Sequence, residues 1–515
     1  MSSLRNLLVR LLPTRYKDYE LVASDSLQLR SLTQHYLHPR HVFRRVFTLR
    51  SILIAVPASL ALLVAAILIN GGVPALYSEV EGVKYLAFPG HIWGHGWNNV
   101  FQEYLMLSYL AYITNRSYVF DDYTWSHTPF PYTIYDFALR PARIPLNAFI
   151  SGPTAGGSIS PSRSSSHGTP SPRAVHTKFW ESICPREKRR VLNAAEMPRD
   201  VWGSGKVDWW KNKITEYGDT RCLEIDTHQK EIFDFDFFGG QEILDVWPSL
   251  SKTPILSDFG WSPLVSSAVE RNFVMLSDSH DSLAAQQSSP ASSSASSQED
   301  VYPALLAVHL RRGDFVRHCA RLAEWGIYFT GFNSLKELPD PWISFNGSSH
   351  VCTHLPFSRY MRLTPSVQDE KKEYYRKRCY PTHEEIVERL HTIRAEHDDT
   401  FVSTQNSNDN HASSSSTSSS TSSSHHLRRV YVLSNAWPIW LDGLKHKLID
   451  DGWEDVIFGG DLILDKEQKG VDVAVDMSIA ERAEVFVGNG FSSVSGNIVM
   501  LRTAKGMDVR TNRLL

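Results

Sequence analysis

Short apolar segments of strand character alternate with longer segments of helical periodicity through most of the chain. Near the start of the first half, a strand is expected at 85–88, a helix at 100–114 and a second strand at 117–120. The second half repeats the pattern. Strands are expected at 304–309, 429–433 and 456–458, and helices at 384–394, 438–450 and 479–484. Strands that alternate with helices form parallel sheets covered on both faces. We therefore expect an α/β protein in which two such sheets face a central cleft.

Three Ser-rich tracts interrupt this pattern. They span 151–171, 288–298 and 403–426, and their other residues are mainly Gly, Pro, Ala, Asn or His. Such segments contain too little apolar surface to offset the entropy lost on ordering, so they are expected to be mobile insertions or linkers. The resulting prediction is two domains at 83–280 and 301–515, a linker at 281–300, and disordered insertions at 151–171 and 403–426.

The bulk composition fits a globular protein and argues against nucleic acid as a partner. Among 515 residues, 42% are hydrophobic and 11% aromatic, which is enough for two or three domains. The formal net charge of -3 provides no attraction to a polyanion, and no zinc-finger, basic-zipper or RNA-binding motif is present. Kinase and hydrolase activities also lack support, since the sequence contains neither a phosphate-binding P-loop nor a Gly-x-Ser-x-Gly turn.

An uncharged stretch at 52–69 predicts a transmembrane helix that anchors the protein in a membrane. As a helix it would span roughly 27 Å, sufficient for a thin bilayer. Arginines precede the stretch and glutamates follow it, which places the amino terminus in the cytosol. Residues 1–51 are thus expected to be a cytosolic basic tail. The remainder would lie in the lumen of the endoplasmic reticulum or Golgi, as in a single-pass type II membrane protein. The alternative is a buried core helix, because the stretch is Ala-rich and near the lower length limit.

Cysteines and glycosylation sequons are compatible with a lumenal location. The five cysteines are at positions 184, 222, 319, 352 and 379. They allow one or two disulfides and leave at least one cysteine unpaired. Their pairing does not follow from the sequence. Asn115 and Asn346 each begin a sequon. Asn346 is the better candidate, because Asn115 ends an apolar helical pattern and has packing as an alternative role.

The strand expected at 304–309 ends in a cation-rich turn, which makes this segment the most informative for function. The carboxyl ends of parallel strands border the ligand crevice of an open α/β sheet. Side chains alternate along a strand, so His309 and Arg311 share one face and Arg312 lies on the other. A guanidinium stays charged at any working pH, and its planar fork suits a diphosphate. The alternative is a surface ion pair between Arg312 and Asp314.

Three segments, taken together and in order, resemble the GDP-fucose protein O-fucosyltransferase family. The first is Gly-His-Gly-Trp-Asn-Asn at 94–99, with the following helix that ends in Asn-Arg-Ser at 115–117. The second is the His-Leu-Arg of residues 309–311. The third contains Asp476, Phe-Val-Gly-Asn at 486–489, Ser-Ser-Val-Ser at 492–495 and Arg502. The resemblance covers about residues 83 to 510.

This resemblance implies a GT-B-like fold, in which two Rossmann-like domains face a central cleft and the second domain holds most of the nucleotide. It also implies an inverting, metal-independent transfer of fucose from GDP-fucose, without a cofactor, to a hydroxyl of a protein or glycan. Arg311 is implied as the catalytic residue that binds the diphosphate and stabilises the charge on the departing GDP. The implied substrate-binding residues are Asp476 for guanine, Ser492 and Ser493 for the phosphates, Asn98 and Asn99 from the opposite domain, and His309 and Asp314 beside the arginine.

Position 95 departs from some members of that family. Those members carry a carboxylate between the two glycines of the opening loop, where this chain has His95. An imidazole with a pKa of about 6.5 can accept a proton from an acceptor hydroxyl near neutral pH, so His95 is a candidate catalytic base. The alternative is a loop histidine that packs or hydrogen-bonds, with catalysis relying on departure of the leaving group.

Two further patterns bear on metal binding and neither is complete. Asp234 and Asp236 would share one face of a strand, where they could hold a divalent ion or form the solvated face of a half-buried strand. The His-x-Cys-x-His of 350–354, and the pair His91 and His95, lack the full ligand set of a zinc site. No metal is therefore expected. The remaining alternatives for function are a catalytically inactive glycan- or protein-binding relative and a transferase that uses another nucleotide sugar.

Overall fold

The computed structural model describes residues 82–89, 96–126, 130–135, 138–159, 172–277, 301–313, 315–345, 365–409 and 426–515. The anchor expected at 52–69, the linker at 281–300 and the sequon residue Asn346 lie outside these ranges. Among the helices that are described, none combines the length and hydrophobicity needed to cross a bilayer. All of the described residues belong to one compact unit, residues 80–515.

The first half forms a five-stranded sheet in which every pairing is parallel. Its spatial order is β8 (Val175–His176), β2 (Ser117–Phe120), β1 (Tyr85–Ala87), β10 (Cys222–Asp226) and β9 (Arg190–Asn193). The chain reverses its direction across the sheet between β1 and β10, and such a reversal leaves a crevice at the carboxyl ends of the two strands. Thr227, directly after β10, donates its hydroxyl to the carbonyl of Pro89, two residues after β1, at 2.9 Å. The two loops that border the crevice are thereby joined.

Helix α4 (Trp97–Ile113) follows β1 and is buried along most of its length, as its nearly continuous apolar sequence requires. The other helices of this half are α5 (Leu146–Phe149), α6 (Thr177–Ile183), α7 (Ser204–Thr215), α8 (Phe235–Gly239), α9 (Glu242–Leu250), α10 (Pro254–Ser257), α11 (Pro263–Arg271) and α12 (Phe273–Leu276). Short antiparallel pairs join β3 (Tyr123–Thr124) to β6 (Arg143–Ile144), β4 (Tyr132–Tyr135) to β5 (Ala138–Pro141), and β7 (Ile150–Ser151) to β11 (Gly260–Trp261).

The second half forms another five-stranded parallel sheet, with the strand order of a Rossmann fold. Its spatial order is β14 (Asp455–Phe458), β13 (Arg429–Ser434), β12 (Tyr302–Leu310), β15 (Ala483–Gly488) and β16 (Asn512–Leu514). The chain reverses direction between β12 and β15. The loops after these two strands therefore border the place where an open α/β sheet binds its ligand.

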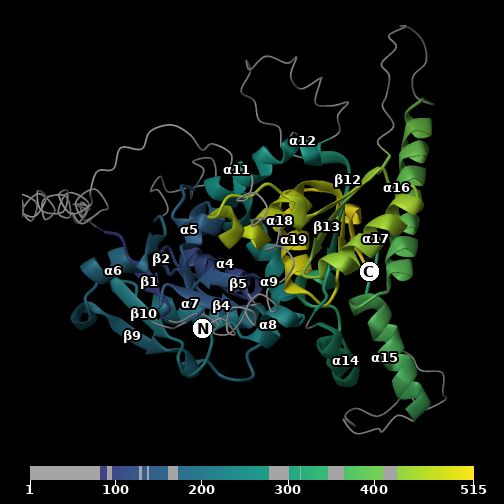
Figure 1. Cartoon of the computed structure of the whole chain (residues 1–515). Helices are drawn as coiled ribbons and strands as arrows, with labels where there is room; N and C mark the ends of the chain where they lie inside the picture. Colours follow the sequence, from purple (N-terminus) through teal and green to yellow (C-terminus); the bar gives the residue numbers. More distant parts are fainter. Residues whose placement is uncertain are drawn as a thin grey trace, which may run out of the picture. The chain divides into compact units, whose positions relative to one another are not determined.

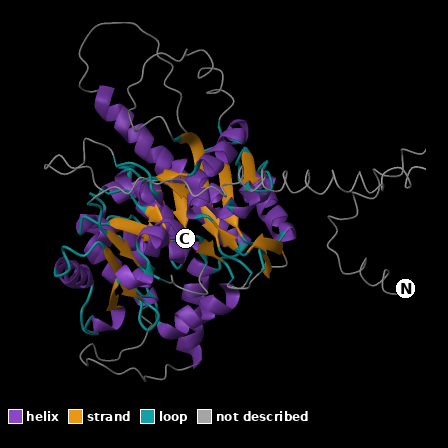
Figure 2. Ribbon diagram, turned by 90° about the vertical axis from the view of Figure 1, so that its left-hand side faces the viewer, coloured by secondary structure: helices purple, strands orange, loops and turns teal. Residues whose placement is uncertain are grey.

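Alternate residues of β12 face two different helical layers. Leu305 and Ala307 belong to the core that also contains residues of α18 (Asp472–Arg482) and α19 (Ser493–Ala504). Leu306, Val308 and Leu310 pack instead with residues of α16 (His383–Asp409) and α17 (Pro438–Asp450). Figure 2 shows the strands enclosed between helices. The remaining helices are α14 (Phe315–Trp325) and α15 (Pro365–Cys379).

The two halves share one apolar core. Helix α4 packs against α19, and α11 packs against α18 (Figure 1). Trp261 of the first half donates its indole N–H to the buried carboxylate of Glu481 in the second half at 2.5 Å. Two parallel sheets are present, one in each half, and both lie within the compact unit of residues 80–515. The domain boundaries expected around 281–300 stay a prediction.

Parts of the Ser-rich tracts are regular structure, contrary to the expectation. Residues 151–159 are built into the first half, where Ser151 pairs with Gly260 in β7 and β11 and Thr154 is buried. Residues 403–409 continue α16. A strand partner and a preceding long helix order these residues despite their composition. Residues 160–171, 288–298 and 410–425 lie outside the described residues.

Other expectations are confirmed to within a few residues. Strand β2 and helix α17 begin and end where the periodicity places them. The helix expected at 479–484 is the end of α18, which starts earlier, at Asp472, and gives way to β15 at Ala483. Hydrophobic periodicity identifies the elements but does not locate their ends.

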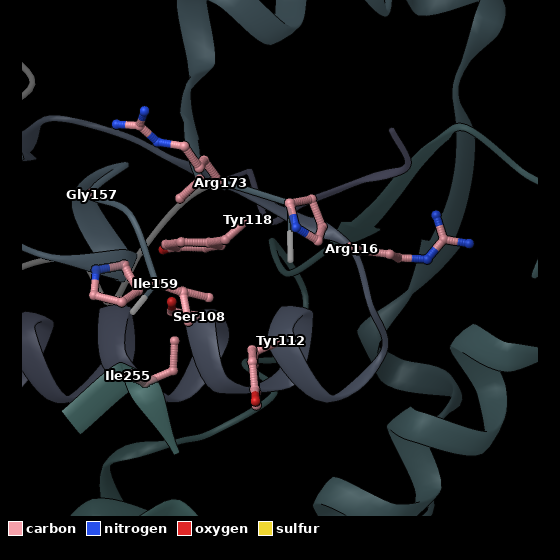
Figure 3. A pocket seen from close by; sticks show the side chains of 11 residues that line it. Ser108, Tyr112, Arg116, Tyr118, Gly157, Ile159, Arg173 and Ile255 are labelled. Atoms are coloured by element: carbon pink, nitrogen blue, oxygen red, sulfur yellow. The ribbon is translucent and has the colours of Figure 1, made fainter. Parts of the chain in front are cut away.

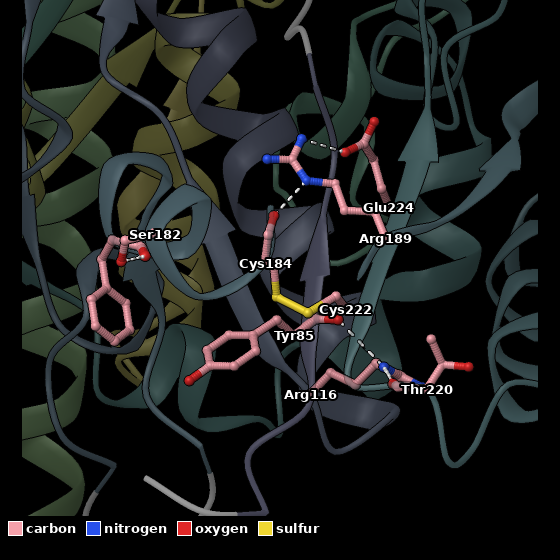
Figure 4. Close-up of a disulfide and its surroundings, with 9 residues drawn as sticks. Tyr85, Arg116, Ser182, Cys184, Arg189, Thr220, Cys222 and Glu224 are labelled. Atoms are coloured by element: carbon pink, nitrogen blue, oxygen red, sulfur yellow. Dashed lines mark hydrogen bonds and ion pairs between the residues drawn. A yellow bond between two sulfur atoms is a disulfide. The ribbon is translucent and has the colours of Figure 1, made fainter. Parts of the chain in front are cut away.

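Two disulfides join four of the five cysteines. Cys184 pairs with Cys222 in the first half (Figure 4), and Cys319 pairs with Cys379 in the second. Arg189 donates to the carbonyl of Cys184 at 2.7 Å and lies 3.1 Å from the carboxylate of Glu224. Cys352 lies outside the described residues. The expectation of one or two disulfides is confirmed at two.

Asn115 occupies the turn between α4 and β2. Its φ of 52° lies in the left-handed region, which asparagine tolerates better than most residues. Its side chain is exposed. The sequon residue is therefore at the surface, and the alternative of a packing role is not seen.

Candidate functional site

The end of β12 presents its two arginines to opposite sides of the sheet. Arg312 is only 3% exposed, and its guanidinium lies between the rings of Tyr380 and Trp440, 4.3 and 4.0 Å from their centroids. It also donates to the carbonyl of Pro381. Burial lowers the pKa of Arg312 to about 10, which leaves it charged near neutral pH. Arg312 is therefore not the surface residue that the ion-pair alternative requires. Asp314 lies outside the described residues.

The backbone of Arg312 is fixed as well as its side chain. Asn435, just after β13, accepts from the N–H of Arg312 at 2.8 Å and donates to its carbonyl at 3.2 Å. Gly313 follows with a φ of 59°, a conformation that a residue with a side chain rarely adopts. The turn that follows Arg311 is thus held at both backbone polar groups of Arg312.

Arg311 follows His309 on the other face of β12. Its side chain is half-buried, and the guanidinium carbon lies 5.1 Å from the ring centroid of Phe315. Arg312 is enclosed by aromatic rings, whereas Arg311 lies close enough to His309 for its charge to lower the pKa of that imidazole.

His309 links β12 to the start of α19. Its Nδ1 lies 2.8 Å from the hydroxyl of Ser495, and that hydroxyl also accepts from the backbone N–H of Asn489 at 2.8 Å. Burial, together with the charge of Arg311, lowers the pKa of His309 to about 3. The imidazole is therefore neutral, and it forms one hydrogen bond with the hydroxyl of Ser495 through Nδ1. His309 is a connecting residue in addition to any contact with substrate.

The loop after β15 is held rigidly in front of α19. Asn489 accepts from the N–H of Phe491 at 3.0 Å, and Asn333 donates to the carbonyls of Gly490 and Ser492, each at 3.1 Å. Ser492 stands at the N-cap position of α19, but its hydroxyl makes no capping hydrogen bond. The capping role that is common for such a serine is therefore not seen, and the N–H groups of the first turn are a ready site for an anion.

Asn98, in the first turn of α4, meets the same helix from the other half. Asn497 of α19 donates its amide to the carbonyl of Asn98 at 2.9 Å and to its side-chain oxygen at 3.0 Å. Asn98 is nearly fully buried and Asn99 is half-buried. His95, which precedes α4, lies outside the described residues. The structure thus brings Asn98 beside α19, although its oxygens already have a protein partner.

Asp476 belongs to α18 and lies beside the middle of β13 and the turn after β14. It accepts from the hydroxyl of Tyr431 at 2.5 Å. It also lies so close under Gly459 that a Cβ there would be 2.7 Å from a carboxylate oxygen. Burial raises the pKa of Asp476 to about 7, with the hydrogen bond from Tyr431 lowering it and the charge of Asp472 adding to the rise. A carboxylate of this kind titrates near neutral pH.

Sequence reasoning missed the asparagines and the serine that hold the site together. Asn489, Asn333, Asn497 and Ser495 organise the loop and the start of α19. Asn489 and Ser495 stand inside the third family-like segment, so their motif was recognised but their role was not. Arg502, in the same segment, is fully buried and donates to backbone carbonyls from Ala480 to Glu484 and to two side chains. Its role is structural.

The aspartates at 234 and 236 do not share one face of a strand. Residues 235–239 form helix α8, and Asp234 is its N-cap, accepting from the N–H of Phe237 at 2.9 Å. The expectation of a strand there was wrong, because the alternation of Phe and Asp fits a short capped helix equally well. Among the residues described, no group of three or more His, Cys, Asp or Glu side chains could hold a metal ion.

Two cavities lie away from this arrangement. A small one of about 20 Å³, lined by Ser108, Tyr112 and Arg116 among others, borders the amino end of β2 (Figure 3). A larger one of about 710 Å³ lies beyond Arg312, against α14, α15 and the starts of α16 and α17. The first is large enough for about one water molecule. Neither contains Arg311, Ser492 or Asp476.

No protein-family model matches the chain, and no curated protein matches it in sequence. Among solved structures, the chain is similar to POFUT1 in complex with GDP-fucose, at 13% identity and a TM-score of 0.44, over 84% of this chain and 97% of that one. It is also similar to POFUT1 in complex with GDP, at 13% identity and a TM-score of 0.43, over the same shares of the two chains. The apo-form of POFUT1 aligns over 85% of this chain and 99% of that one, at 13% identity and a TM-score of 0.39.

Proposed function

We propose that this protein is a glycosyltransferase that transfers fucose from GDP-fucose to a hydroxyl of a protein or glycan. The observation that carries the proposal is the hydrogen bond between His309 and Ser495. It joins the His-Leu-Arg strand end to the Ser-Ser helix start at the point where the second sheet reverses direction. Arg311 and the first turn of α19 can thereby bind the same ligand. A diphosphate needs two such groups, because both of its phosphates carry negative charge.

The chemistry follows from these two anion-binding elements. The bond between the sugar C1 and the phosphate oxygen breaks, and the electron pair leaves with GDP. Arg311 and the N–H groups behind Ser492 and Ser493 stabilise the added negative charge on the diphosphate. The acceptor oxygen attacks C1 from the opposite face, so the configuration inverts, and its proton passes to a base or to solvent. A guanidinium in the place of a divalent ion makes the transfer independent of metal.

Asp476 supplies the specificity for the base in this proposal. As a carboxylate it accepts hydrogen bonds, and guanine presents adjacent N–H donors on one edge. Its position against β13 and the turn after β14 suits a nucleotide that extends across the sheet from Arg311. Asn98 and Asn99 approach from the first half. His95 is the proposed base toward the acceptor; wild-type rates and an unchanged pH profile in His95→Gln would exclude it.

The deciding experiment compares nucleotides first and turnover second. GDP should raise the melting temperature of the full-length protein more than UDP or ADP does, because a ligand stabilises the state that binds it. Hydrolysis and transfer of GDP-fucose should persist in a chelator. Both should be lost in Arg311→Ala and kept in Arg186→Ala, whose side chain is exposed in the first half.

Other outcomes of this experiment would favour a different function. Stabilisation by GDP without turnover on a panel of peptides and glycans would favour an inactive binding relative. A preference for UDP or ADP would indicate another nucleotide sugar. Normal turnover by Arg311→Ala would overturn the catalytic assignment.

We also propose that the protein is anchored by residues 52–69, with residues 80–515 in the lumen of the endoplasmic reticulum or Golgi. Two disulfides support an oxidising compartment. The exposed sequon at Asn115 supplies a direct test, since a glycan can be attached only in the lumen. Glycosidase treatment should increase the mobility of the protein from cells, and Asn115→Gln should reduce that shift. Protease sensitivity of residues 80–515 in sealed microsomes would contradict the proposal.

A further inference from the structure

The segment from Cys379 to Pro381 bridges the two strand ends that border the proposed diphosphate site. On the β15 side, Asn489 donates its side-chain amide to the carbonyl of Cys379 at 2.9 Å. On the β12 side, Arg312 donates to the carbonyl of Pro381. Three consecutive residues therefore contact both strand ends, although they belong to neither strand.

A disulfide holds this segment at its first residue. Cys379 is the last residue of α15 and is fully buried, and it pairs with Cys319 of α14. Helix α14 begins at Phe315, directly beyond the β12 turn. The connections therefore form a closed ring. It runs from β12 into α14, through the disulfide to Cys379, and on to the loop after β15, and the pairing of β15 with β12 closes it.

We propose that the Cys319–Cys379 disulfide positions the donor-binding groups, by holding the β12 turn and the β15 loop so that Arg311 and the start of α19 engage one diphosphate. This inference rests on the proposed function. Arg312 shares a peptide bond with Arg311, and Asn489 lies three residues before Ser492. A displacement of residues 379–381 would thus displace both Arg311 and the start of α19.

The contacts of Arg312 show how the bridge transmits position. Its guanidinium packs on Tyr380 as well as on Trp440, and the bridging segment therefore supplies one of the two rings. Neither cysteine touches the proposed donor, and neither does Tyr380. They are positioning residues, and their loss should act on donor affinity through geometry alone.

The first-half disulfide is a matched control. Cys184 follows α6 and Cys222 begins β10, so this link lies at the amino ends of the first sheet, away from the carboxyl ends that border the crevice. The two pairs are separated by 38 and 60 residues. The entropy of loop closure grows only with the logarithm of loop length, so removing either link should lower stability to a similar extent.

The test compares Cys319→Ala/Cys379→Ala with Cys184→Ala/Cys222→Ala in the full-length protein. The GDP dissociation constant is measured by calorimetry at a temperature where both variants and the wild type are folded. Both double variants should have a lower melting temperature than the wild type. Only the Cys319/Cys379 variant should bind GDP more weakly, by about tenfold, as expected for a small misplacement of binding groups. Its KM for GDP-fucose should rise in parallel.

Equal dissociation constants in the two pairs would overturn the inference while leaving the proposed function intact. Where the Cys319/Cys379 variant does not fold, Tyr380→Leu replaces it, because this change removes the ring from Arg312 and keeps the disulfide. Tyr380→Phe restores the ring and should restore GDP affinity; equal affinity of the Leu and Phe variants would overturn the inference. Failure of the wild type to bind GDP would overturn the proposed function and the inference with it.

Discussion

Asn497 donates its side-chain amide to both oxygens of Asn98, at 2.9 Å to the carbonyl and 3.0 Å to the side chain. The two residues belong to α19 and α4, the helices that follow β15 and β1. Those strands lie at the reversal points of the two sheets. One asparagine pair therefore fixes the ligand-facing end of each half against the other.

Asn497→Ala should destabilise the protein by about 1–3 kcal/mol, because it leaves two buried oxygens of Asn98 without their donor. Urea denaturation of the full-length protein measures the change. Asn99→Ala, at the half-buried neighbouring position, should stay within about 0.5 kcal/mol of the wild type. Equal effects of the two changes would show that the pair contributes nothing beyond ordinary helix packing.

Adjacent arginines of the β12 turn should differ in how strongly their mutation lowers stability. Arg311→Ala should change stability little but weaken GDP binding by roughly tenfold or more, since a charge-assisted hydrogen bond contributes about 1.5–3 kcal/mol. Arg312→Ala should cost about 2–3 kcal/mol of stability, because it removes two aromatic contacts and the donor to Pro381. Denaturation curves and GDP titrations on both variants separate the two effects. A stable Arg312→Ala protein would contradict the structural role.

Affinity for GDP should rise between pH 6 and pH 8. Burial raises the pKa of Asp476 to about 7, and only its ionised form can accept from two adjacent guanine donors with both oxygens. Tyr431→Phe removes the hydrogen bond that lowers this pKa, so the midpoint should move to higher pH. Asp472→Asn removes a repelling charge and should move the midpoint to lower pH. GDP titrations across this pH range in Asp476→Asn should show no such rise.

The same carboxyl group should make stability depend on pH in the opposite sense. Its pKa in the folded protein is above the unfolded value of about 3.9. The folded state therefore holds the proton more tightly, and this contribution to stability is complete below pH 4 and lost as the pH rises through about 7. Thermal melts without ligand, compared between the wild type and Asp476→Asn, should show the difference shrink toward low pH. A constant difference would exclude Asp476 as the titrating group.

Arg502→Lys should be among the most destabilising single changes in α19, by about 3 kcal/mol or more. The guanidinium is fully buried and donates to several carbonyls, to Asn512 at 2.7 Å and to Thr511 at 2.8 Å. An ammonium has three donors and a different geometry, so acceptors would be left unsatisfied. Chemical denaturation measures the loss. A stability close to the wild type would show that water replaces the missing bonds.

Much of the architecture follows from local sequence patterns. The strands β2 and β12 and the helix α17 follow from short apolar runs and from helical periodicity, which depend only on neighbours along the chain. The helix α8 did not follow, because Phe and Asp alternate there in a way that suits a strand, while the N-cap at Asp234 decides for a helix. In a segment of about one helical turn, a helix-capping residue and a strand-like alternation of apolar and polar residues favour different structures. Hydrophobicity alone does not show which of the two will form.

The candidate site divides in the same way. The sequence by itself determined that charge stands at the end of a buried strand and that His309 and Arg311 share a face, because side-chain alternation is a property of any strand. Only the tertiary structure decided that Arg312 is enclosed by Tyr380 and Trp440, since those rings come from segments far along the chain. Cysteine pairing and the contact of Asn98 with Asn497 were decided there too, because they depend on distances that residue spacing does not contain.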